Sequence, residues 1–194
     1  GTTGPFGAAI ACALLLGLDT ERLLNAIGIA GSLASGLRQF SVSDTGSMVK
    51  RLHFGRAAEG GVLAASLAAE GFDGPHDILE GKAGFLKVFC DHYNAEELTR
   101  GLDDGTFLIR EIAMKRFGTH GSSQIPLQAL LEVRAKHPFA HHEIESIKIT
   151  AAPEAVEHHD NLSPTYLMQT QYSVPFCVAL ACVRDIRYPR SLDV

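Results

Sequence analysis

The sequence lacks the motifs that define several common enzyme classes. It contains no G-x-G-x-x-G fingerprint, no P-loop and no G-x-S-x-G nucleophile elbow. These absences argue against the standard dinucleotide, nucleoside-triphosphate and α/β-hydrolase sites. The cysteines are few and form no C-x-x-C pair; they stand at Cys12, Cys90, Cys177 and Cys182. This spacing argues against a zinc ribbon or a disulfide framework and predicts reduced, buried thiols in a cytoplasmic protein.

A metal site is not predicted, because the histidines do not have ligand spacing. His137 and His141 are four residues apart, but Pro138 stands between them and disfavours a helical pair. Basic residues are also in deficit, with 17 Lys and Arg against 22 Asp and Glu and a net charge of −5. We therefore expect no nucleic-acid partner, whereas a basic pocket for an acidic substrate remains possible.

No apolar run is long enough to cross a bilayer. The longest in the first part of the chain, residues 8–16, has nine residues, whereas a spanning helix needs about 20. No membrane partner is expected. The chain begins with Gly1, has its first Met at Met48 and ends soon after an apolar stretch. We therefore expect it to be an internal piece of a longer protein.

Hydrophobic residues make up 46% of the chain and charged residues 20%, which is enough apolar material for a core. Their pattern predicts a mainly α fold with an inserted α+β unit. The expected helices are 6–16, 21–37, 56–70, 122–136 and 171–183, and the expected strands are 106–114 and 142–151. The predicted division is a part of an all-helical domain over 1–105, an α+β lid over 106–165, and a return to the helical domain over 166–194.

The predicted helix 21–37 is rich in small residues. Gly28, Gly31, Ser32, Ala34, Ser35 and Gly36 leave one face almost without side chains. Glycine destabilises a helix by about 1 kcal/mol relative to alanine. Several in one helix therefore predict that another helix packs very closely against it.

The first candidate site is the polar segment 38–55, which lies between two apolar helices. It combines the cations and imidazole of Lys50, Arg51 and His53 with the hydroxyl residues Ser43, Thr45 and Ser47. Such groups suit a carboxylate or phosphate ligand through charge-assisted hydrogen bonds. A solvated basic loop without a ligand is the alternative.

The second candidate site is the segment 114–120, at the junction of the predicted strand and helix. Lys115, Arg116 and His120 lie there beside backbone N–H groups at the expected helix start. Helix N-termini favour anions, so this segment could hold a second carboxylate or phosphate. The alternative is a plain turn.

Three segments in this order resemble the MmgE/PrpD superfamily. They are the GPFGAAIACALLLGLD sequence from Gly4, the KRLHFGRAA sequence from Lys50 and the MKRFGTH sequence from Met114. The superfamily includes 2-methylcitrate dehydratase, cis-aconitate decarboxylase and an iminodisuccinate epimerase. The resemblance implies a larger all-helical domain joined to a smaller α+β lid, a homodimer, and a site between the two domains. Full members are more than twice as long as this chain.

The resemblance also implies roles for individual residues. Lys50 and Lys115 match the two lysines that line the family's polycarboxylate site, and His120 matches a histidine found after the second lysine. His53 matches a motif histidine. Some members use a tyrosine farther on, and near that point this chain has His158 or His159. The implied set is catalytic Lys50, Lys115 and His120, with Arg51, His53, Arg116 and His158 binding substrate. Gly118 stands where proline is usual.

The residues and the resemblance together predict a lyase that needs no cofactor and acts on a small polycarboxylate. A base would remove a proton α to a carboxylate, and the lysines would stabilise the resulting anion. Dehydration of a 2-methylcitrate-like hydroxy acid is the default expectation. A decarboxylase or an epimerase of the same family is an alternative, and so is a catalytically incomplete piece with only an interface role.

Overall fold

The computed structural model describes residues 1–41 and 48–193, and the chain divides into two compact units. The first unit comprises Gly1–Phe40 and Met48–Leu108, and the second contains the residues from Ile109 onward. The predicted division into 1–105, 106–165 and 166–194 stays a prediction.

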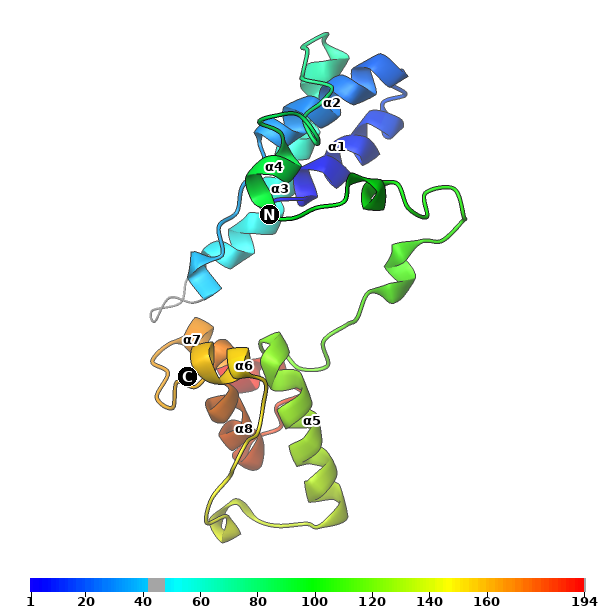
Figure 1. Ribbon diagram of the computed structural model, residues 1–194. Coiled ribbons are helices and arrows are strands. Elements are labelled where there is room, and N and C mark those ends of the chain that lie inside the picture. The colour runs from blue at the N-terminus through cyan, green and yellow to red at the C-terminus, as the bar shows by residue number, and fades with distance from the viewer. Residues whose placement is uncertain (42–47, 194) are drawn as a thin grey trace. The chain divides into compact units, whose positions relative to one another are not determined.

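Three helices form the first unit: α1 (Gly4–Leu15), α2 (Thr20–Ser32) and α3 (Val49–Ala69). They pack side by side, with α3 against both of the others (Figure 1). Their shared core is built mainly from alanines that are at most 1% exposed, namely Ala9, Ala13, Ala26, Ala30, Ala64, Ala65 and Ala68. Because these side chains are short, the helix axes can approach closely.

Local signals set the ends of these helices. The Asp19 carboxylate accepts a hydrogen bond of 2.9 Å from the Arg22 backbone N–H, which makes Asp19 the N-cap of α2. Gly17 and Gly71 follow the ends of α1 and α3 with φ of +66° and +88°, a conformation that favours glycine. The predicted helix 21–37 ends earlier, at Ser32.

The small residues of α2 do permit a close approach, but the neighbour is a turn rather than a helix. A Cβ at Gly28 would lie 2.5 Å from the Pro75 carbonyl oxygen, and a side chain at Gly31 would collide with Ile78. The close helix contact occurs instead at Gly61 of α3, where a Cβ would lie 2.6 Å from the Pro5 carbonyl oxygen. The prediction therefore located a real close contact and named the wrong partner.

Short elements complete the first unit. They are α4 (Phe85–Phe89) and the 3₁₀ turns Gln39–Ser41 and Ala95–Leu98. The rings of Phe6 in α1 and Phe85 in α4 meet edge to face, with centroids 5.1 Å apart. This aromatic pair fixes α4 on the helical core.

The second unit is built on α5 (Gly121–Lys136) and α8 (Val174–Val183), with α6 (Pro153–His158) and α7 (Leu167–Tyr172) beside them (Figure 1). Three 3₁₀ turns add Leu108–Glu111, His141–Glu143 and Pro189–Leu192. A second apolar core holds this unit together and consists of Phe117, Leu127, Cys177, Val178, Leu180, Ala181, Ile186 and Leu192. The predicted helix 122–136 is confirmed by α5.

The predicted α+β unit is wrong. The described residues contain no strand: 106–114 holds a 3₁₀ turn with irregular flanks, and 142–151 is irregular apart from the end of a 3₁₀ turn. Phe107, Leu108 and Ile109 are 66–74% exposed, so these apolar residues face no partner sheet. β-Branched composition favours a strand only where a neighbour accepts the backbone hydrogen bonds and covers one face. The described fold is therefore all-helical.

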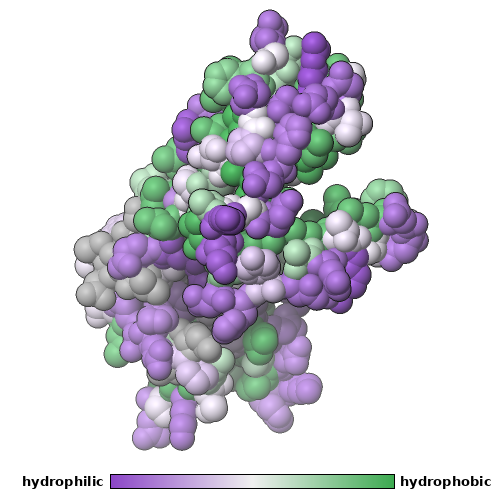
Figure 2. Space-filling model, turned by 45° about the horizontal axis from the view of Figure 1, so that its top comes forward, coloured by the Kyte–Doolittle hydropathy of each residue, from purple (hydrophilic) through white to green (hydrophobic). Residues whose placement is uncertain are grey.

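None of the described helices combines the length and the apolar character needed to span a membrane. Apolar side chains nevertheless reach the surface, including Leu14, Leu15 and Leu16 at the end of α1, which are 55–88% exposed. Figure 2 shows such apolar residues interspersed with polar ones on the face in view.

Candidate functional site

One side chain of α5, that of Gln124, forms hydrogen bonds with several groups of the loop from Lys115 to His120. The Gln124 amide oxygen accepts hydrogen bonds of 3.1 Å from the backbone N–H groups of Arg116 and Phe117. Its amide nitrogen donates to the Phe117 carbonyl at 3.1 Å and to the Thr119 hydroxyl at 3.0 Å. Gln124 thus satisfies both donors and acceptors of the loop, which fixes the loop's backbone.

Phe117 anchors the same loop from the other direction. Its side chain is 2% exposed and belongs to the second core, whereas its neighbours Lys115 and Arg116 are exposed. Burial of one aromatic ring between polar residues fixes where the flanking side chains emerge. The loop therefore presents Lys115 and His120 on a rigid support rather than on a mobile turn.

His120 is the N-cap of α5 and forms hydrogen bonds through both its ring and its backbone. Its Nδ1 accepts from the Ser122 backbone N–H at 3.3 Å, and its own backbone N–H donates to the Gln171 carbonyl at 2.7 Å. An Nδ1 that accepts an N–H bond leaves the proton of the neutral ring on Nε2. In that tautomer, the Nε2–H of His120 can donate a hydrogen bond, whereas release of a proton requires the imidazolium form.

Three aromatic rings from separate elements meet at His120. The His120 ring lies 4.1 Å from that of His159 and 4.8 Å from that of Tyr172, measured between centroids, and it stacks on Tyr172 at 28°. His159 follows α6 and is 7% exposed, and its carbonyl accepts from the Val174 N–H at 2.8 Å. α5, α6 and α7 therefore all contribute to the environment of one imidazole.

Lys115 turns back toward the same loop. Its Nζ donates a hydrogen bond of 3.3 Å to the Thr119 carbonyl, the residue before His120. The predicted pair of Lys115 and His120 therefore lies on one loop, with an ammonium group and an imidazole at its two ends. Such a pair can neutralise a carboxylate and exchange a proton.

Two other predicted residues lie elsewhere. Arg116 is exposed and its Nη1 donates to the Gln128 side chain at 2.5 Å, away from the ring cluster. His158 is exposed at the end of α6, and its buried neighbour His159 is the one that contacts His120. Roles for Arg116 and His158 in substrate binding stay predictions.

The first candidate segment is partly helical rather than a loop. Lys50, Arg51 and His53 all lie in the first two turns of α3. His53 meets Phe40 edge to face at 5.1 Å and lines a cavity of about 280 Å³ together with apolar residues of the first unit. Ser43, Thr45 and Ser47 lie outside the described residues. The assignment of Lys50, Arg51 and His53 to a substrate site stays a prediction.

In the part of the chain that the structure describes, no three His, Cys, Asp or Glu residues converge as a metal site would require. All four cysteines are free thiols. Burial raises the pKa of the Cys177 thiol to about 11, and the Ser123 hydroxyl lowers it slightly. Cys177 therefore stays protonated at neutral pH and serves the core.

Known proteins match this chain over most of its length. Residues 1–98 match the family model of the MmgE/PrpD N-terminal domain. The cis-aconitate decarboxylase of Aspergillus terreus is 33% identical over 144 residues, which cover 70% of this chain and 28% of that protein. The chain belongs to the MmgE/PrpD family.

Two further relatives of this MmgE/PrpD chain give the same picture. The cis-aconitate decarboxylase of Homo sapiens is 32% identical over 136 residues, covering 69% of the chain and 27% of that protein. A cis-aconitate decarboxylase-like protein of Aspergillus oryzae is 30% identical over 172 residues, covering 83% of the chain and 35% of that protein. The chain thus spans between about a quarter and a third of the length of these relatives. The family predicted from three short segments is confirmed.

Tyr172 was not singled out from the sequence of this MmgE/PrpD chain, and His159 was left as an alternative to His158. Tyr172 lies in a QYSVPF stretch that carries no recognisable motif. The only usable signal was the pair of adjacent histidines, and sequence alone does not tell which of two neighbours faces inward. In the structure, His159 is the buried one of the two and contacts the His120 ring.

Proposed function

We propose that the protein containing this chain is a lyase that removes CO₂ from an unsaturated tricarboxylate such as cis-aconitate. The observation that carries the proposal is the rigid loop that presents Lys115 and His120 beside His159 and Tyr172. The relatives named as cis-aconitate decarboxylases support this reaction over the dehydration expected from the sequence. A lyase of the carbon–carbon type is therefore preferred to a hydro-lyase.

The chemistry needs one positive charge and one proton. When the C–C bond to a carboxylate on the allylic carbon breaks, CO₂ leaves and the electron pair passes into a dienolate shared with a remaining carboxylate. Protonation at the far carbon then gives an unsaturated dicarboxylate. The sum consumes one proton and no oxidant or reductant, so no cofactor is required by the balance.

The residues of the loop suit these two tasks. The Lys115 ammonium would neutralise the carboxylate that becomes the dienolate, which stabilises the charge that develops in the transition state. His120, once protonated to the imidazolium, would deliver the proton from Nε2, and its Nδ1–H would then donate to the Ser122 hydroxyl at 3.2 Å. His159 and Tyr172 would hold the imidazole in position through their ring contacts.

The remaining expectations belong to the same proposal. Lys50 is proposed as a second cation for the substrate, with Arg51 and His53 on the same helix turn as further contacts. A homodimer in the cytoplasm, with a small polycarboxylate as its partner molecule, is likewise proposed. These elements follow from the family resemblance.

The test is a set of assays on the protein that contains this chain, with cis-aconitate, 2-methylcitrate and citrate as substrates. Release of CO₂ from cis-aconitate is the expected result. Alkene formation from 2-methylcitrate without CO₂ would instead show a hydro-lyase, and exchange of the α-proton alone would show an epimerase. No turnover of any of the three would contradict the proposal.

Variants then test the assignment of residues. Lys115→Ala and His120→Asn should each lower kcat/KM by about 100-fold or more, the usual range for loss of an electrostatic or acid–base group. Asparagine retains a side-chain acceptor for the N-cap of α5. Lys136→Ala, which removes an exposed lysine at the other end of α5, is the matched control and should change kcat/KM little. Values within a few-fold of the wild type for both test variants would refute the site.

A further inference from the structure

A groove in the second unit gathers arginines from separate parts of the chain. It is an open groove of about 590 Å³ between α5 and the segment that follows α8. Its charged lining residues are Arg116, Glu132, Arg134, Arg184, Asp185 and Arg187. Four guanidinium groups against two carboxylates leave two net positive charges, in a chain whose total charge is −5.

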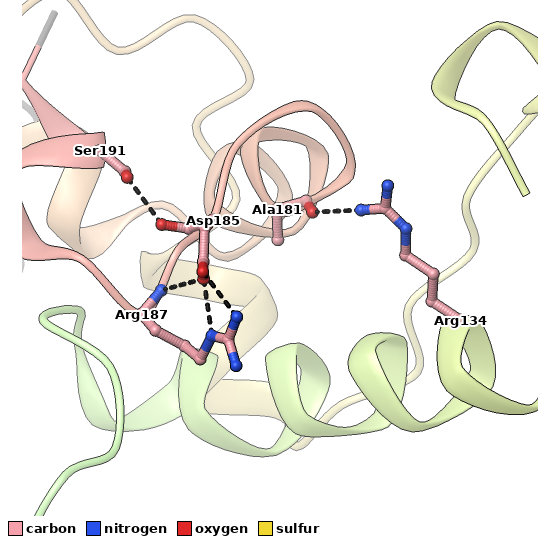
Figure 3. Close-up of polar contacts among 5 residues, drawn as sticks. All are labelled: Arg134, Ala181, Asp185, Arg187 and Ser191. Atoms are coloured by element: carbon pink, nitrogen blue, oxygen red, sulfur yellow. Dashed lines mark hydrogen bonds and ion pairs between the residues drawn. The ribbon is translucent and has the colours of Figure 1, made fainter. Parts of the chain in front are cut away.

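The carboxylates of the groove are already occupied. Asp185 accepts from Arg187 Nε at 2.8 Å and from its Nη2 at 2.6 Å, the paired geometry drawn in Figure 3. This guanidinium holds the pKa of Asp185 below its usual value. Glu132 accepts a hydrogen bond of 2.6 Å from the Gln128 amide. Neither acid forms an ion pair with Arg116, Arg134 or Arg184 among the described residues.

The other three arginines are held in place by one nitrogen each. Arg134 Nη1 donates to the carbonyls of Ala181 and Cys182 at the end of α8, as Figure 3 shows for Ala181. Arg184 Nη1 donates to the Ser191 carbonyl at 3.3 Å. Arg116 Nη1 donates to Gln128. Guanidinium groups carry five N–H donors, so each of these three retains donors for a ligand while its position is fixed.

We infer that this groove binds a compact multivalent oxyanion, of the diphosphate or tricarboxylate class. Fixed guanidinium forks match the oxygen pairs of phosphate and carboxylate groups. The volume of the groove is that of a small-molecule pocket rather than of a single-ion site. A singly charged anion would leave one of the two net charges without a partner.

This groove shares Arg116 with the Lys115–His120 loop but does not include the residues of the proposed reaction. Lys115, His120, His159 and Tyr172 are not among the residues that line the groove. Arg116 therefore lines the groove, whereas the adjacent Lys115 does not and instead donates to the Thr119 carbonyl. The inference stands independently of the proposed decarboxylation, because its readout is binding and not turnover.

The experiment is isothermal titration calorimetry of the 194-residue chain at low ionic strength. Pyrophosphate is the probe in one arm and citrate in the other, and chloride serves as the monovalent comparison. We expect at least one of the two multivalent probes to bind at one site per chain. The probe that binds more tightly shows whether the groove prefers a diphosphate or a tricarboxylate. No saturable binding of either probe up to about 10 mM, where the weakest specific complexes would still register, overturns the inference.

Variants distinguish binding in the groove from diffuse electrostatic attraction to the protein surface. Arg116→Gln and Arg184→Gln should each weaken binding at least about fivefold, as the loss of one charge-assisted hydrogen bond requires. Glu132→Gln should tighten binding, a gain that loss of folding cannot imitate. Arg184 also ties down the C-terminal segment, so Arg116→Gln and Glu132→Gln decide the matter if Arg184→Gln melts early in circular dichroism.

Two controls complete the design. Arg100→Gln removes an exposed arginine of the first unit, changes the net charge equally and should leave binding unchanged. Lys115→Ala should leave pyrophosphate binding unchanged, and citrate is not used with this variant because the proposed substrate site at Lys115 would bind it as well. Equal weakening by Arg100→Gln would show diffuse electrostatic attraction, and loss of binding in Lys115→Ala with retention in Arg116→Gln would place the anion at the loop. Either result overturns the inference.

Discussion

The imidazole rings of His120 and His159 lie in contact, with their centroids 4.1 Å apart, although the two residues are 39 positions apart in the chain. His120 caps the start of α5 and His159 follows the end of α6, so the contact joins two helices. The Tyr172 ring completes the group at 4.8 Å from His120. Because His159 is almost fully buried, the pair is part of the packing of the second unit as well as of its proposed chemistry.

Removal of the His159 ring should therefore destabilise the protein. His159→Ala leaves a void beside His120 and should lower the free energy of unfolding by about 2–3 kcal/mol, by analogy with other large-to-small substitutions in cores. His159→Phe retains a ring of similar size and the ring contacts, which contribute about 0.5–1.5 kcal/mol. Urea denaturation followed by circular dichroism measures both.

The comparison between the two variants is the informative part. If His159→Phe regains most of the lost stability but turnover stays low, the imidazole has a chemical role beyond packing. Equal stabilities of the alanine and phenylalanine variants would contradict the packing argument. His158→Ala is the matched control, since His158 is exposed and its loss should change stability little.

Gln124 should be the residue on which the geometry of the loop depends. Gln124→Leu keeps the size of the side chain but leaves the backbone N–H groups of Arg116 and Phe117 without their acceptor. The bond to the Phe117 N–H is part-buried, and such a donor left unsatisfied costs about 1–3 kcal/mol. The expected result is a similar loss of stability together with a fall in kcat/KM, measured by denaturation and by the decarboxylation assay.

Gln128 provides the control for this prediction. It lies one turn farther along α5, and its bonds to Arg116 and Glu132 are exposed. Gln128→Leu should therefore change the free energy of unfolding by about 0.5 kcal/mol or less. If Gln124→Leu behaved no differently from Gln128→Leu, the loop would owe its shape to Phe117 alone.

The helices were the predictable part of the fold, and the strands were not. Helix α5 follows from the amphipathic pattern over 122–136. In contrast, 106–114 and 142–151 have strand composition without strand pairing. Helix hydrogen bonds are local and can be read along the chain, whereas a strand depends on a partner that composition does not name.

The candidate site shows the same division between local and distant information. Lys115 and His120 could be found because they lie in one short segment with a recognisable pattern. Tyr172 and the choice of His159 over His158 could not, because the contact depends on how α6 and α7 pack against the start of α5. Arg116 is adjacent to Lys115 in the sequence and lines the groove between α5 and the segment after α8, which the sequence does not reveal.

Gly118, which stands in this loop where the family usually has proline, should tolerate a side chain. Its φ lies outside the left-handed region, and a Cβ would meet Leu192 and Pro189 at ordinary distances of 3.7 Å. Gly118→Ala should therefore raise stability by about 0.4–1 kcal/mol, because the unfolded chain loses conformational freedom. Thermal denaturation measures the shift, and turnover should be retained.

At Gly61 in α3, a change from glycine to alanine should lower the stability of the protein instead of raising it. The added Cβ would lie 2.6 Å from both the Pro5 carbonyl oxygen and the Ala9 backbone nitrogen, so α1 would have to move. Gly61→Ala should lower stability by about 1–3 kcal/mol, the usual cost of overpacking. A stabilised Gly61→Ala or a destabilised Gly118→Ala would show that these local spacings do not describe the protein.

We expect ionisation of the Cys177 thiol to lower the stability of the protein at alkaline pH. The folded state raises the pKa of this thiol from 9.0 to about 11, because burial disfavours the thiolate. The unfolded chain therefore releases this proton first, and between pH 9 and 11 the folded state binds more protons than the unfolded state. Stability from this group is fully present below pH 9 and falls as the pH rises through 11, by about 2–3 kcal/mol in total.

Urea denaturation at pH 8 and at pH 10.5 measures this loss against a variant that cannot ionise. Cys177→Ala should show a smaller decrease between the two pH values than the wild type, although its stability at pH 8 is lower because the sulfur leaves a small void in the core. The thiol should also react with a thiol reagent more slowly than the half-buried Cys12 and Cys90 in the folded state. Parallel pH dependences for the wild type and Cys177→Ala would assign the alkaline loss to other groups.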